Sequence, residues 1–455
     1  MNMFKKGLFI FRRDLRVHDN TGLIYALENA DEVICVFVFT PEQIDKNPYR
    51  SDFCLQFMLE SIEDLEKELE KNGGKLFCFF DAPEKIVEKC IKKLGVDLVV
   101  VNRDYTPYSI QRDKMIEKVC KHEDVAFNSF DDLLLHPPEH LLKNNGDPYT
   151  VFTPFYRNAT KLHVDPPQTN SYKNYSKNCI EFAREYSSFK TILPCRHPAQ
   201  SGGRKEALKI LNNFANFSHY EVERDYPIKD ATTHLSPHLK FTTVSAREVY
   251  YAIQKNLGPH HALTRSLYWR DFFSSIALHF PYVFKGAFHS KFNQLSWENS
   301  PANFKYWCEG VTGFPIVDAG MRELNKTGYM HNRVRMIVAS FLVKDLHINW
   351  QHGEKYFAQH LIDYDPAVNN GNWQWAASTG CDAQPYFRIF NPWLQQIKFD
   401  PECKYIKKWI PELANKDPKT IHNWYKQENP SEYPLPIVEH ALEAKKALAY
   451  YQNKE

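Results

Sequence analysis

The chain has 455 residues, of which 43% are hydrophobic, and its 57 Lys and Arg nearly balance its 55 Asp and Glu, leaving a formal charge of +2. This length and composition exclude a mainly disordered protein and favour two or three domains with full hydrophobic cores. The small net charge excludes a globally basic surface, so any binding of nucleic acid must come from a local basic patch. Aromatic residues make up 15% of the chain, which favours a site that stacks planar ligands or bases.

Residues 6–128 alternate short apolar runs with amphipathic stretches. The runs GLFIF, VICVFVF, KLFCFF and DLVVV predict strands, and the other stretches predict helices ending at Asn29, near 52–72, near 84–93 and near 109–121. Strands this apolar are buried on both faces, so we expect an α/β domain with a doubly wound parallel sheet. Such a sheet binds ligands at the carboxyl ends of its strands.

The pattern changes after residue 130. Residues 130–200 contain HPPEH, DPPQ and LPCRHP without sustained periodicity, which predicts a long connection between two domains. Beyond 200 the periodicity is helical, and residues 328–347 predict one long helix. Its apolar face comprises Met330, Val334, Ile337, Val338, Phe341 and Leu342. A Lys/Ala-rich tail after 440 is the only hint of low complexity. We therefore expect an α/β domain over 1–130, a connection over 131–200 and an all-helical domain over 201–455.

The compartment is predicted from cysteines and apolar runs. The ten cysteines are scattered with no C-x-x-C pair, which indicates free thiols in a reducing environment. The N-terminal segment has too short an apolar run for a signal peptide, and no stretch approaches the length of a membrane span. We expect a monomeric intracellular protein without membrane association, located in the cytoplasm, or in the nucleus if the source is eukaryotic.

Several familiar sites are missing from the sequence. It contains no G-x-G-x-x-G, P-loop or H-E-x-x-H motif, and Ala367 and Val368 break the EF-hand pattern that begins at Asp363. The pairs His136/His140 and His260–His261 have no Cys or acidic partner at ligand spacing, so we expect solvated or capping histidines. No metal site is expected.

Polar and aromatic residues are most concentrated within 329–375. On one predicted helix face lie Asn332, Arg335 and Met336, and they are followed by Asp363, Asp365, Asn369, Asn370, Trp373 and Trp375. A paired arginine and carboxylate beside amides and indoles suits a planar, hydrogen-bonding heterocycle, although for each residue alone an interior ion pair or a core tryptophan is the better interpretation. The concentration of these residues favours a site. The two tryptophans point about 200° apart on a helix, so they serve different faces.

Long motifs run in order through the whole chain. They are FIFRRDLRVHDN (9–20), ERDYP (223–227), TTHLSPHLKF (232–241), LYWRDF (267–272), TGFPIVDAGMREL (312–324), GYMHNRVRM (328–336) and DYDPAVNNGNWQWAASTGCDAQPYFRIFNP (363–392). By these segments the chain resembles the photolyase/cryptochrome flavoprotein family. It is most similar to the class I cyclobutane pyrimidine dimer photolyases, because MHNRVRM, the W-x-W-AA-S-T-G run and YPLPIVEH (433–440) match that branch. The resemblance implies an enzyme that uses light to repair UV-damaged DNA.

The resemblance also implies a bent FAD in the helical domain. At its phosphates and ribityl chain it places Tyr220, Thr232, Thr233, His234, Leu235 and Ser236, and at the rest of the cofactor Arg270, Asn332, Arg335, Asp363, Asp365 and Asn369. Arg335 would pair with Asp363, and the amide of Asn369 can accept a hydrogen bond from N5–H of reduced flavin.

The resemblance also assigns residues to electron transfer and to DNA binding. Trp297, Trp350 and Trp373 match the family's relay, which reduces FAD under light, and with Asn369 they form the implied catalytic set. The residues implied to contact DNA or the flipped-out dimer are Arg224, Ser266, Trp269, Arg270, Asn332, Arg333, Met336, Trp375 and Gln395. Flipping costs less free energy at a dimer than at normal bases, because the crosslinked bases stack and pair badly.

Three positions bear on specificity. Ser266 replaces a carboxylate that usually contacts the dimer, and Tyr108-Ser109 replaces the Asn-Glu pair of the folate-binding branch. A second, antenna chromophore is therefore left open between a folate, a deazaflavin, a flavin and an empty site. The branch that repairs 6-4 photoproducts carries a histidine where this chain has Met336, so only cyclobutane dimers are expected to be split.

Two alternatives to a repair enzyme remain. A cryptochrome photosensor would share the fold without repair, but signalling forms commonly carry a long tail, whereas this chain ends 15 residues after His440. A nucleotide-binding protein explains the first 128 residues but not the Trp and Asn cluster.

Overall fold

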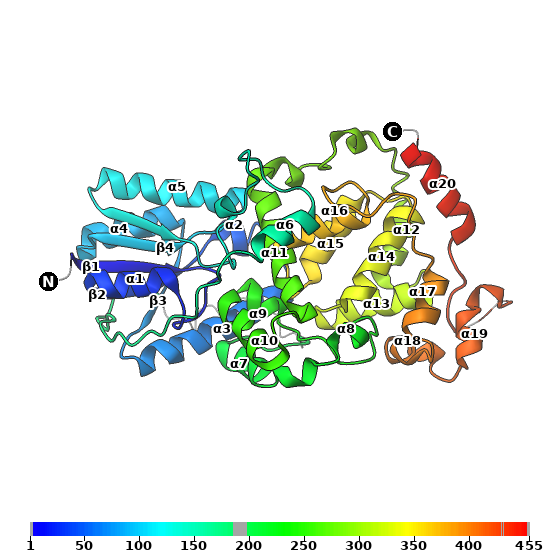
Figure 1. The fold of residues 1–455 in the computed structure, drawn as a ribbon, viewed down its shortest axis with the longest axis horizontal. Helices are drawn as coiled ribbons and strands as arrows, with labels where there is room; N and C mark the ends of the chain where they lie inside the picture. The colour runs from blue at the N-terminus through cyan, green and yellow to red at the C-terminus, as the bar shows by residue number, and fades with distance from the viewer. Residues whose placement is uncertain (1–2, 185–197, 429, 431, 453–455) are drawn as a thin grey trace. The chain divides into compact units, whose positions relative to one another are not determined.

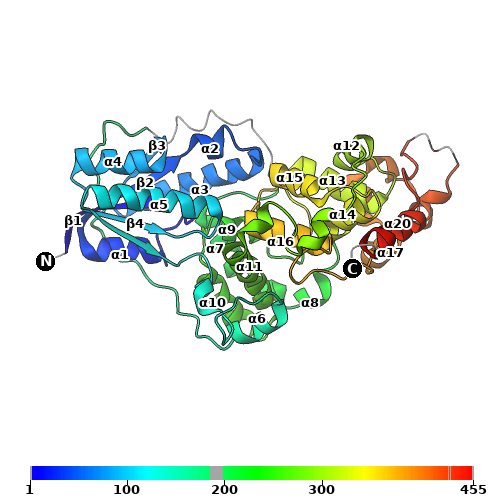
Figure 2. The ribbon, with the colours of Figure 1, turned by 90° about the horizontal axis from the view of Figure 1, so that it is seen from above.

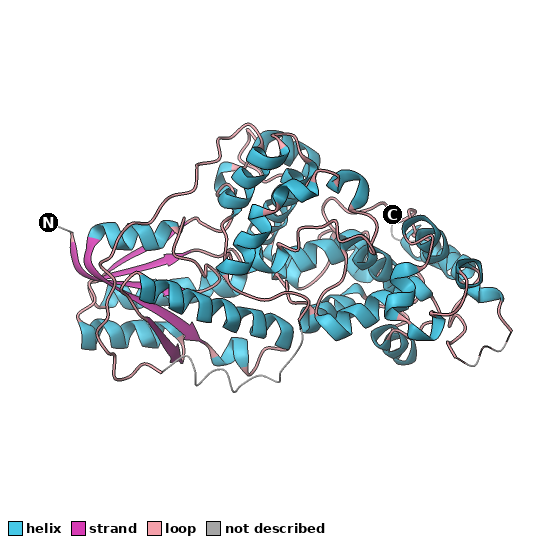
Figure 3. Ribbon diagram, turned by 90° about the horizontal axis from the view of Figure 1, so that it is seen from below, coloured by secondary structure: helices cyan, strands magenta, loops and turns pink. Residues whose placement is uncertain are grey.

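The computed structural model describes residues 3–184, 198–428, 430 and 432–452, and these form two compact units. The first unit comprises the described residues up to 184 together with 200–216 and 233–281, and the second comprises 198–199, 217–232 and the described residues from 282 onward. Among the described residues, strands occur in the first unit and the second is helical (Figure 3). The predicted fold class is confirmed, while the boundaries at 130 and 200 stay a prediction. Residues 185–197 of the expected connection, with Cys195, lie outside the described residues.

The first unit is built on a parallel five-stranded sheet in the order β3-β2-β1-β4-β5. Its strands are β1 (Phe4–Phe11), β2 (Ala30–Phe39), β3 (Leu76–Phe80), β4 (Leu98–Asn102) and β5 (Ala126–Phe130). The four predicted apolar runs form β1 to β4. The sequence did not predict β5, because the strand is not a buried apolar run and includes the half-buried Asn128 and the exposed Ser129.

Helices flank the sheet on both faces, with α1 and α3 on one side and α4 and α5 on the other (Figure 1). The helices of this unit are α1 (Thr21–Asn29), α2 (Pro41–Ile44), α3 (Asp52–Lys71), α4 (Pro83–Leu94), α5 (Pro107–His122), α6 (Phe152–Ala159), α7 (Arg204–Asn212), α9 (Ser236–Lys240), α10 (Ala246–Leu257) and α11 (Ala262–His279). The predicted helices α1, α3, α4 and α5 are confirmed. The strand order reverses between β1 and β4, where ligands bind in sheets of this kind.

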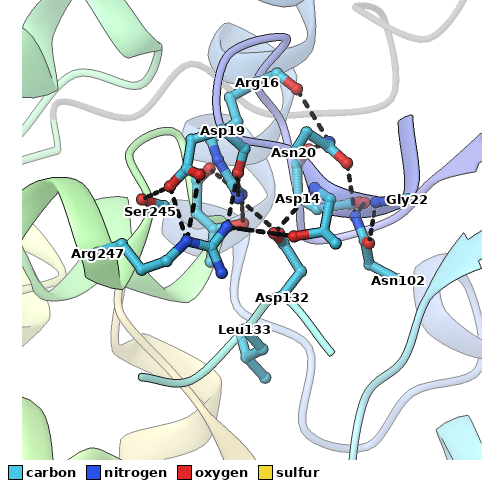
Figure 4. A network of polar contacts seen from close by, with 12 residues as sticks. Asp14, Arg16, Asp19, Asn20, Gly22, Asn102, Asp132, Leu133, Ser245 and Arg247 are labelled. Atoms are coloured by element: carbon cyan, nitrogen blue, oxygen red, sulfur yellow. Dashed lines mark hydrogen bonds and ion pairs between the residues drawn. The ribbon is translucent and has the colours of Figure 1, made fainter. Parts of the chain in front are cut away.

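A buried polar network ties the segment after β1 to α10 (Figure 4). The Asp132 carboxylate accepts from Arg16 Nη2 at 2.6 Å and from Arg247 Nη2 at 2.8 Å. Arg247 Nε also donates to Asp19, at 3.0 Å from Oδ2. Burial raises the pKa of Asp132, but the two arginines outweigh it and hold this pKa at about 2. The network therefore keeps its charges paired within this unit.

The second unit is a helical assembly around α14. Its helices are α8 (Tyr220–Glu223), α12 (Pro301–Glu309), α13 (Pro315–Thr327), α14 (Asn332–Lys344), α15 (Trp350–His360), α16 (Pro366–Ala376), α17 (Pro392–Phe399), α18 (Lys404–Trp409), α19 (Pro418–His422) and α20 (His440–Gln452). Helix α14 packs against α13, α15, α16 and α20 (Figure 2). Within the described residues, the Lys/Ala-rich tail forms α20, which ends at Gln452.

The helix predicted over 328–347 is shorter than expected. Helix α14 begins at Asn332 because His331 caps it, accepting a hydrogen bond from the N–H of Arg333 on its ring nitrogen. Met330 therefore precedes the helix, although its side chain is buried. The other five residues of the expected apolar face are buried on α14, as predicted.

The histidine prediction is correct at three positions and wrong at one, and two of the three, His140 and His260, are exposed. His261 caps α11, accepting from the N–H of Leu263. His136 is neither solvated nor a cap, because it is buried with its ring stacked on Tyr268 at 6.3 Å. Every cysteine within the described ranges is free. No helix of the described chain is long and apolar enough to span a membrane.

Candidate active site

An arginine–carboxylate pair links α14 to the segment before α16. Arg335 Nη1 and Nη2 donate to the two Asp363 oxygens at 3.2 and 2.9 Å, and its Nε donates to Met330 O at 2.7 Å. The Asp363 side chain is only 5% exposed. Burial lowers the pKa of Arg335, but Asp363 outweighs burial and raises it above its ordinary value. The predicted pair is confirmed. Its two parallel hydrogen bonds join a planar guanidinium to a planar carboxylate with balanced charges, and we call this pair the Arg335–Asp363 fork.

Helix α16 carries the side-chain amide of Asn369, whose oxygen is available to a ligand. Asp365 caps the helix, with Oδ1 accepting from the N–H groups of Ala367 and Val368. One turn later, Asn369 Nδ2 donates to Glu354 O at 3.0 Å, which fixes the orientation of the amide. No described residue donates to Asn369 Oδ1, although the residue is buried. This oxygen can therefore accept a hydrogen bond from a ligand.

The buried Glu354, whose backbone carbonyl orients Asn369, also binds the neighbouring amide through its carboxyl group. Glu354 Oε1 accepts from Asn370 Nδ2 at 2.9 Å, and the same nitrogen donates to Val283 O at 3.0 Å. Burial raises the pKa of Glu354 to about 7, against a lowering by its hydrogen bond to Asn370. The sequence analysis missed Glu354. Its spacing, four residues after Trp350 and three before Phe357, already places a carboxylate on the apolar face of α15.

The three relay tryptophans belong to one hydrophobic core. Trp373 and Trp350 are buried, and Trp297 is half-buried against the same core. A Cβ added at Gly353 would lie 2.2 Å from Trp373 Cη2, so this indole rests directly on α15, one turn beyond Trp350. Trp307, which has no place in the predicted relay, is fully buried and donates its indole N–H to Val338 O at 3.1 Å.

Most residues implied to bind DNA lie in the second unit. Asn332 is exposed and its Nδ2 lies 3.8 Å from Met336 Sδ, so the two share a face of α14 as predicted. Gln395 Oε1 is buried without a partner among the described residues. Arg333 is paired with Asp225 at 2.8 Å, which offsets its charge. Three further residues of this unit are half-buried, namely Arg224, Trp375 and the FAD-binding candidate Tyr220. Thr232, another FAD-binding candidate of this unit, is also half-buried.

The remaining implied residues lie in the first unit. Arg270 donates to Leu133 O at 2.7 Å and to Leu239 O at 3.0 Å, so it also fastens backbone segments together. One face of Trp269 is covered by Phe152, at 3.6 Å between ring centroids and 5° between planes.

Five more residues of the first unit have implied roles. Four of them are implied to contact the phosphates and ribityl chain of FAD, and the fifth, Ser266, replaces a carboxylate that usually contacts the dimer. Thr233, His234 and Leu235 precede α9, which starts at the exposed Ser236, and His234 has a left-handed backbone (φ 51°). Ser266 is exposed on α11. Their ligand-binding roles stay predictions.

Comparison with known proteins decides the family. Residues 8–171 match the profile described as DNA photolyase, and residues 263–453 match the one described as FAD binding domain of DNA photolyase. The deoxyribodipyrimidine photo-lyase of Agrobacterium fabrum is 37% identical over 97% of this chain and 96% of its own length. This chain belongs to the DNA photolyase family.

Solved structures of the family agree with this assignment. The chain is similar to an archaeal photolyase from Sulfolobus tokodaii with two FAD molecules, at 45% identity and a TM-score of 0.91 over 98% of this chain and all of that one. It is also similar to a bacterial class III photolyase from Agrobacterium tumefaciens, at 36% identity and a TM-score of 0.92 over 99% and 98%. Membership of the class I branch stays a prediction.

The residues of the second unit fit FAD. Residues 263–453 match an FAD-binding domain, and the free Oδ1 of Asn369 is an acceptor of the kind that suits the N5–H of a reduced flavin. The charge-balanced fork of Arg335 and Asp363 offers a rigid polar edge for the same ring system. Donors and acceptors of this site therefore suit a flavin ring.

Proposed function

We propose that this chain is a light-driven lyase that splits cyclobutane pyrimidine dimers in DNA. The observation that carries the proposal is the arrangement of α16. Asn369 and Trp373 are four residues apart, so the flavin acceptor and the first relay tryptophan share one buried face of this helix. Trp375 lies two residues further on, half-buried on another face, which is free to serve the substrate.

The residues have distinct tasks in this function. Bound FAD, in its reduced form, supplies light absorption and the electron that opens the dimer. Asn369 would hold the proton at N5 by accepting its hydrogen bond, and the ion pair of Arg335 with Asp363 would keep the site charge-balanced. Trp373, Trp350 and Trp297 supply electrons to restore the reduced cofactor, because indole is the most easily oxidised common side chain. The electron returns from the opened dimer, so repair has no net redox change.

Substrate recognition is proposed for one face of α14 and its surroundings. Met336 packs against the apolar edge of the dimer, while Asn332 and the unpartnered Gln395 Oε1 hydrogen-bond its base edges. Arg224 contacts backbone phosphate and so contributes affinity without sequence preference. Separately, in the first unit, Ser266 offers one hydroxyl in place of the usual carboxylate. The partner is therefore UV-damaged DNA, and the protein acts inside the cell.

A second chromophore is proposed to be a flavin. The archaeal relative holds two FAD molecules, whereas Tyr108-Ser109 lacks the Asn-Glu pair of the folate-binding branch. At the carboxyl end of β1, Arg12 Nε and Nη2 and Arg112 Nη2 are buried without acceptors among the described residues. Unmatched guanidinium donors favour an anionic group such as a phosphate. Purified protein should then contain two flavins per chain, and a single flavin would contradict this part of the proposal.

The repair function is tested with defined lesions. Chemically reduced protein is illuminated with blue light in the presence of oligonucleotides carrying a cyclobutane dimer or a 6-4 photoproduct, and the products are separated by chromatography. We expect cyclobutane dimers to be split and 6-4 products to stay intact, since the thioether of Met336 cannot act as a general acid. Intact cyclobutane dimers under fully reducing conditions would contradict repair and favour the photosensor.

A further inference from the structure

Two arginines implied to contact DNA differ in the acidic partner that each one has. Arg224 directly follows α8, with its guanidinium 5.3 Å from the ring centroid of Tyr220, and no carboxylate of the described chain pairs with it. The next residue, Asp225, places Oδ1 2.8 Å from Nη2 of Arg333 on the first turn of α14. The charge of Arg224 is therefore available to a ligand, while that of Arg333 is offset.

Two contacts fix the position of Arg333. Its guanidinium lies over the ring of the buried Phe399, 4.4 Å from the centroid. The second contact is the ion pair with Asp225, in which the side chains of Arg333 and Asp225 are 17% and 35% exposed. Arg333 Nε is buried without an acceptor among the described residues. A long cationic side chain is therefore held in one place near the surface, with donor capacity left over.

A second ion pair in the same segment has no connection to α14. Glu223 Oε1 accepts from Lys229 Nζ at 2.7 Å, and the Glu223 side chain is 36% exposed. Neither Glu223 nor Lys229 is implied to contact DNA. The carboxylates of Glu223 and Asp225 therefore differ in the cation that each one pairs with, not in their exposure.

The partner of Arg333 resembles the ligand that Arg333 is expected to bind. A guanidinium binds a carboxylate and a phosphate through the same planar set of donors, so Asp225 occupies Arg333 as a DNA phosphate would. Arg333 directly follows Asn332, which is proposed to hydrogen-bond the flipped-out dimer. A strand that presents its dimer to α14 therefore brings a phosphate to the start of this helix. A strand that stays stacked has no phosphate there to displace Asp225.

We propose that Asp225 determines the specificity of DNA binding by holding Arg333 until a phosphate beside a flipped-out dimer replaces it. The inference rests on the proposed function and gives a role to a residue that the resemblance does not assign. On undamaged DNA, Arg333 stays on Asp225 and contributes no phosphate contact. On damaged DNA, Arg333 binds the phosphate and Asp225 is released to solvent, whereas Arg224 serves both kinds of DNA.

The dependence of DNA affinity on salt counts these contacts, because each neutralised phosphate contributes about 0.9 to the slope of log K against log salt concentration. Duplex oligonucleotides with and without one cyclobutane dimer are titrated with FAD-loaded protein in the dark, so that no repair occurs. For the parent protein, we expect a slope that is steeper by about one for the damaged duplex.

Asp225→Asn removes the charge of the carboxylate and frees Arg333 to reach any backbone phosphate. The slope for the undamaged duplex should steepen by about one, and its affinity should rise roughly fivefold near physiological salt. The slope for the damaged duplex should stay unchanged, because Arg333 already contacts a phosphate there. The difference between the two slopes should therefore disappear.

Two further variants show whether the effect depends on Arg333. Glu223→Gln removes a carboxylate of matched exposure from the same segment and should leave both slopes unchanged. Asp225→Asn combined with Arg333→Gln should return the slope for the undamaged duplex to its parent value. A purely structural role of Asp225 would change the melting temperature of Asp225→Asn but not the difference between the slopes, and this result would contradict the inference.

The remaining outcomes separate this inference from the proposed function. Steepening that occurs equally in Glu223→Gln, or that persists in the double variant, would overturn the role of Asp225. In both cases the parent protein still prefers the damaged duplex, so the proposed function is unaffected. A parent protein that binds the two duplexes with equal affinity and equal slope would contradict the proposed function together with this inference.

Discussion

Asp363 balances the guanidinium of Arg335 where little water is present, since its side chain is 5% exposed. Asp363→Ala leaves this arginine without its counter-ion, and we expect the free energy of unfolding to fall by about 3 kcal/mol. The flavin content of the purified protein should fall with it. Both quantities are measured on the same sample, by denaturant unfolding and by the ratio of flavin to protein absorbance.

A matched control is available at a more exposed ion pair. Glu412 accepts from Arg322 Nη1 on both oxygens at 2.8 Å, but its side chain is 34% exposed. Glu412→Ala should therefore cost less than about 1 kcal/mol and leave the flavin content unchanged. Full flavin content and unchanged stability in Asp363→Ala would remove Asp363 from the proposed FAD site.

The buried carboxyl of Glu354 makes stability depend on pH. Its pKa is raised from 4.5 to about 7, so the folded protein binds an additional proton between these pH values and loses stability as the pH rises through them. Glu354→Gln keeps an acceptor for Asn370 but cannot ionise. Relative to the parent protein, the variant should gain roughly 3 kcal/mol between pH 4.5 and pH 7.5. Parallel stability curves for the two proteins over this range would show that Glu354 is ionised in the fold.

Trp373 tests the separation of photoreduction from repair. Trp373→Phe keeps an aromatic ring in the core but raises the cost of oxidising the residue, so light-driven reduction of oxidised FAD should slow strongly. Dimer repair by chemically reduced protein should continue, because the relay does not take part in it. Trp307→Phe is the control, because Trp307 is also buried but has no place in the proposed relay. Its indole N–H donates to Val338 O. Normal photoreduction in Trp373→Phe would make this tryptophan purely structural.

At the scale of elements, the contact between α15 and α16 depends on Gly353. A Cβ at this position would lie 2.2 Å from Trp373 Cη2 and 2.5 Å from Leu342 Cδ2. Overpacking costs about 1–3 kcal/mol and outweighs the gain of roughly 1 kcal/mol in helix propensity. Gly353→Ala should therefore lower the melting temperature and change the fluorescence of Trp373. An equal or higher melting temperature would show that the two helices separate easily.

Helices and strands were predicted from the sequence where one hydrophobic periodicity dominates, and they were missed where none does. Strands β1 to β4 each contain a continuous apolar run, whereas β5 carries the half-buried Asn128 and the exposed Ser129. Helix α6 is short and lies among turn-forming residues, so no period was detected. Helix α14 was predicted one turn too long at its start, because an apolar pattern does not reveal that His331 caps it.

At the scale of the whole chain, contacts between residues distant in sequence set the limit of prediction. The Arg335–Asp363 pair joins residues 28 positions apart within one dense motif, and the sequence predicted it. Glu298 and Tyr450 are separated by 152 positions and Arg16 and Asp132 by 116, with no local pattern to connect them. Only the tertiary fold brings such groups together, which explains why the pairing of Arg16 with Asp132 was not predicted.

The central claim is that light drives repair with return of the electron, so that the reduced cofactor is not consumed. The most direct measurement reduces the FAD-loaded protein once, removes the reductant and oxygen, and illuminates it with an excess of dimer-containing oligonucleotide. The number of dimers split per protein molecule is then counted by chromatography. We predict that it rises far beyond one and stops when the light is turned off. Splitting that ends at one dimer per bound FAD, or that continues in the dark, would contradict the claim.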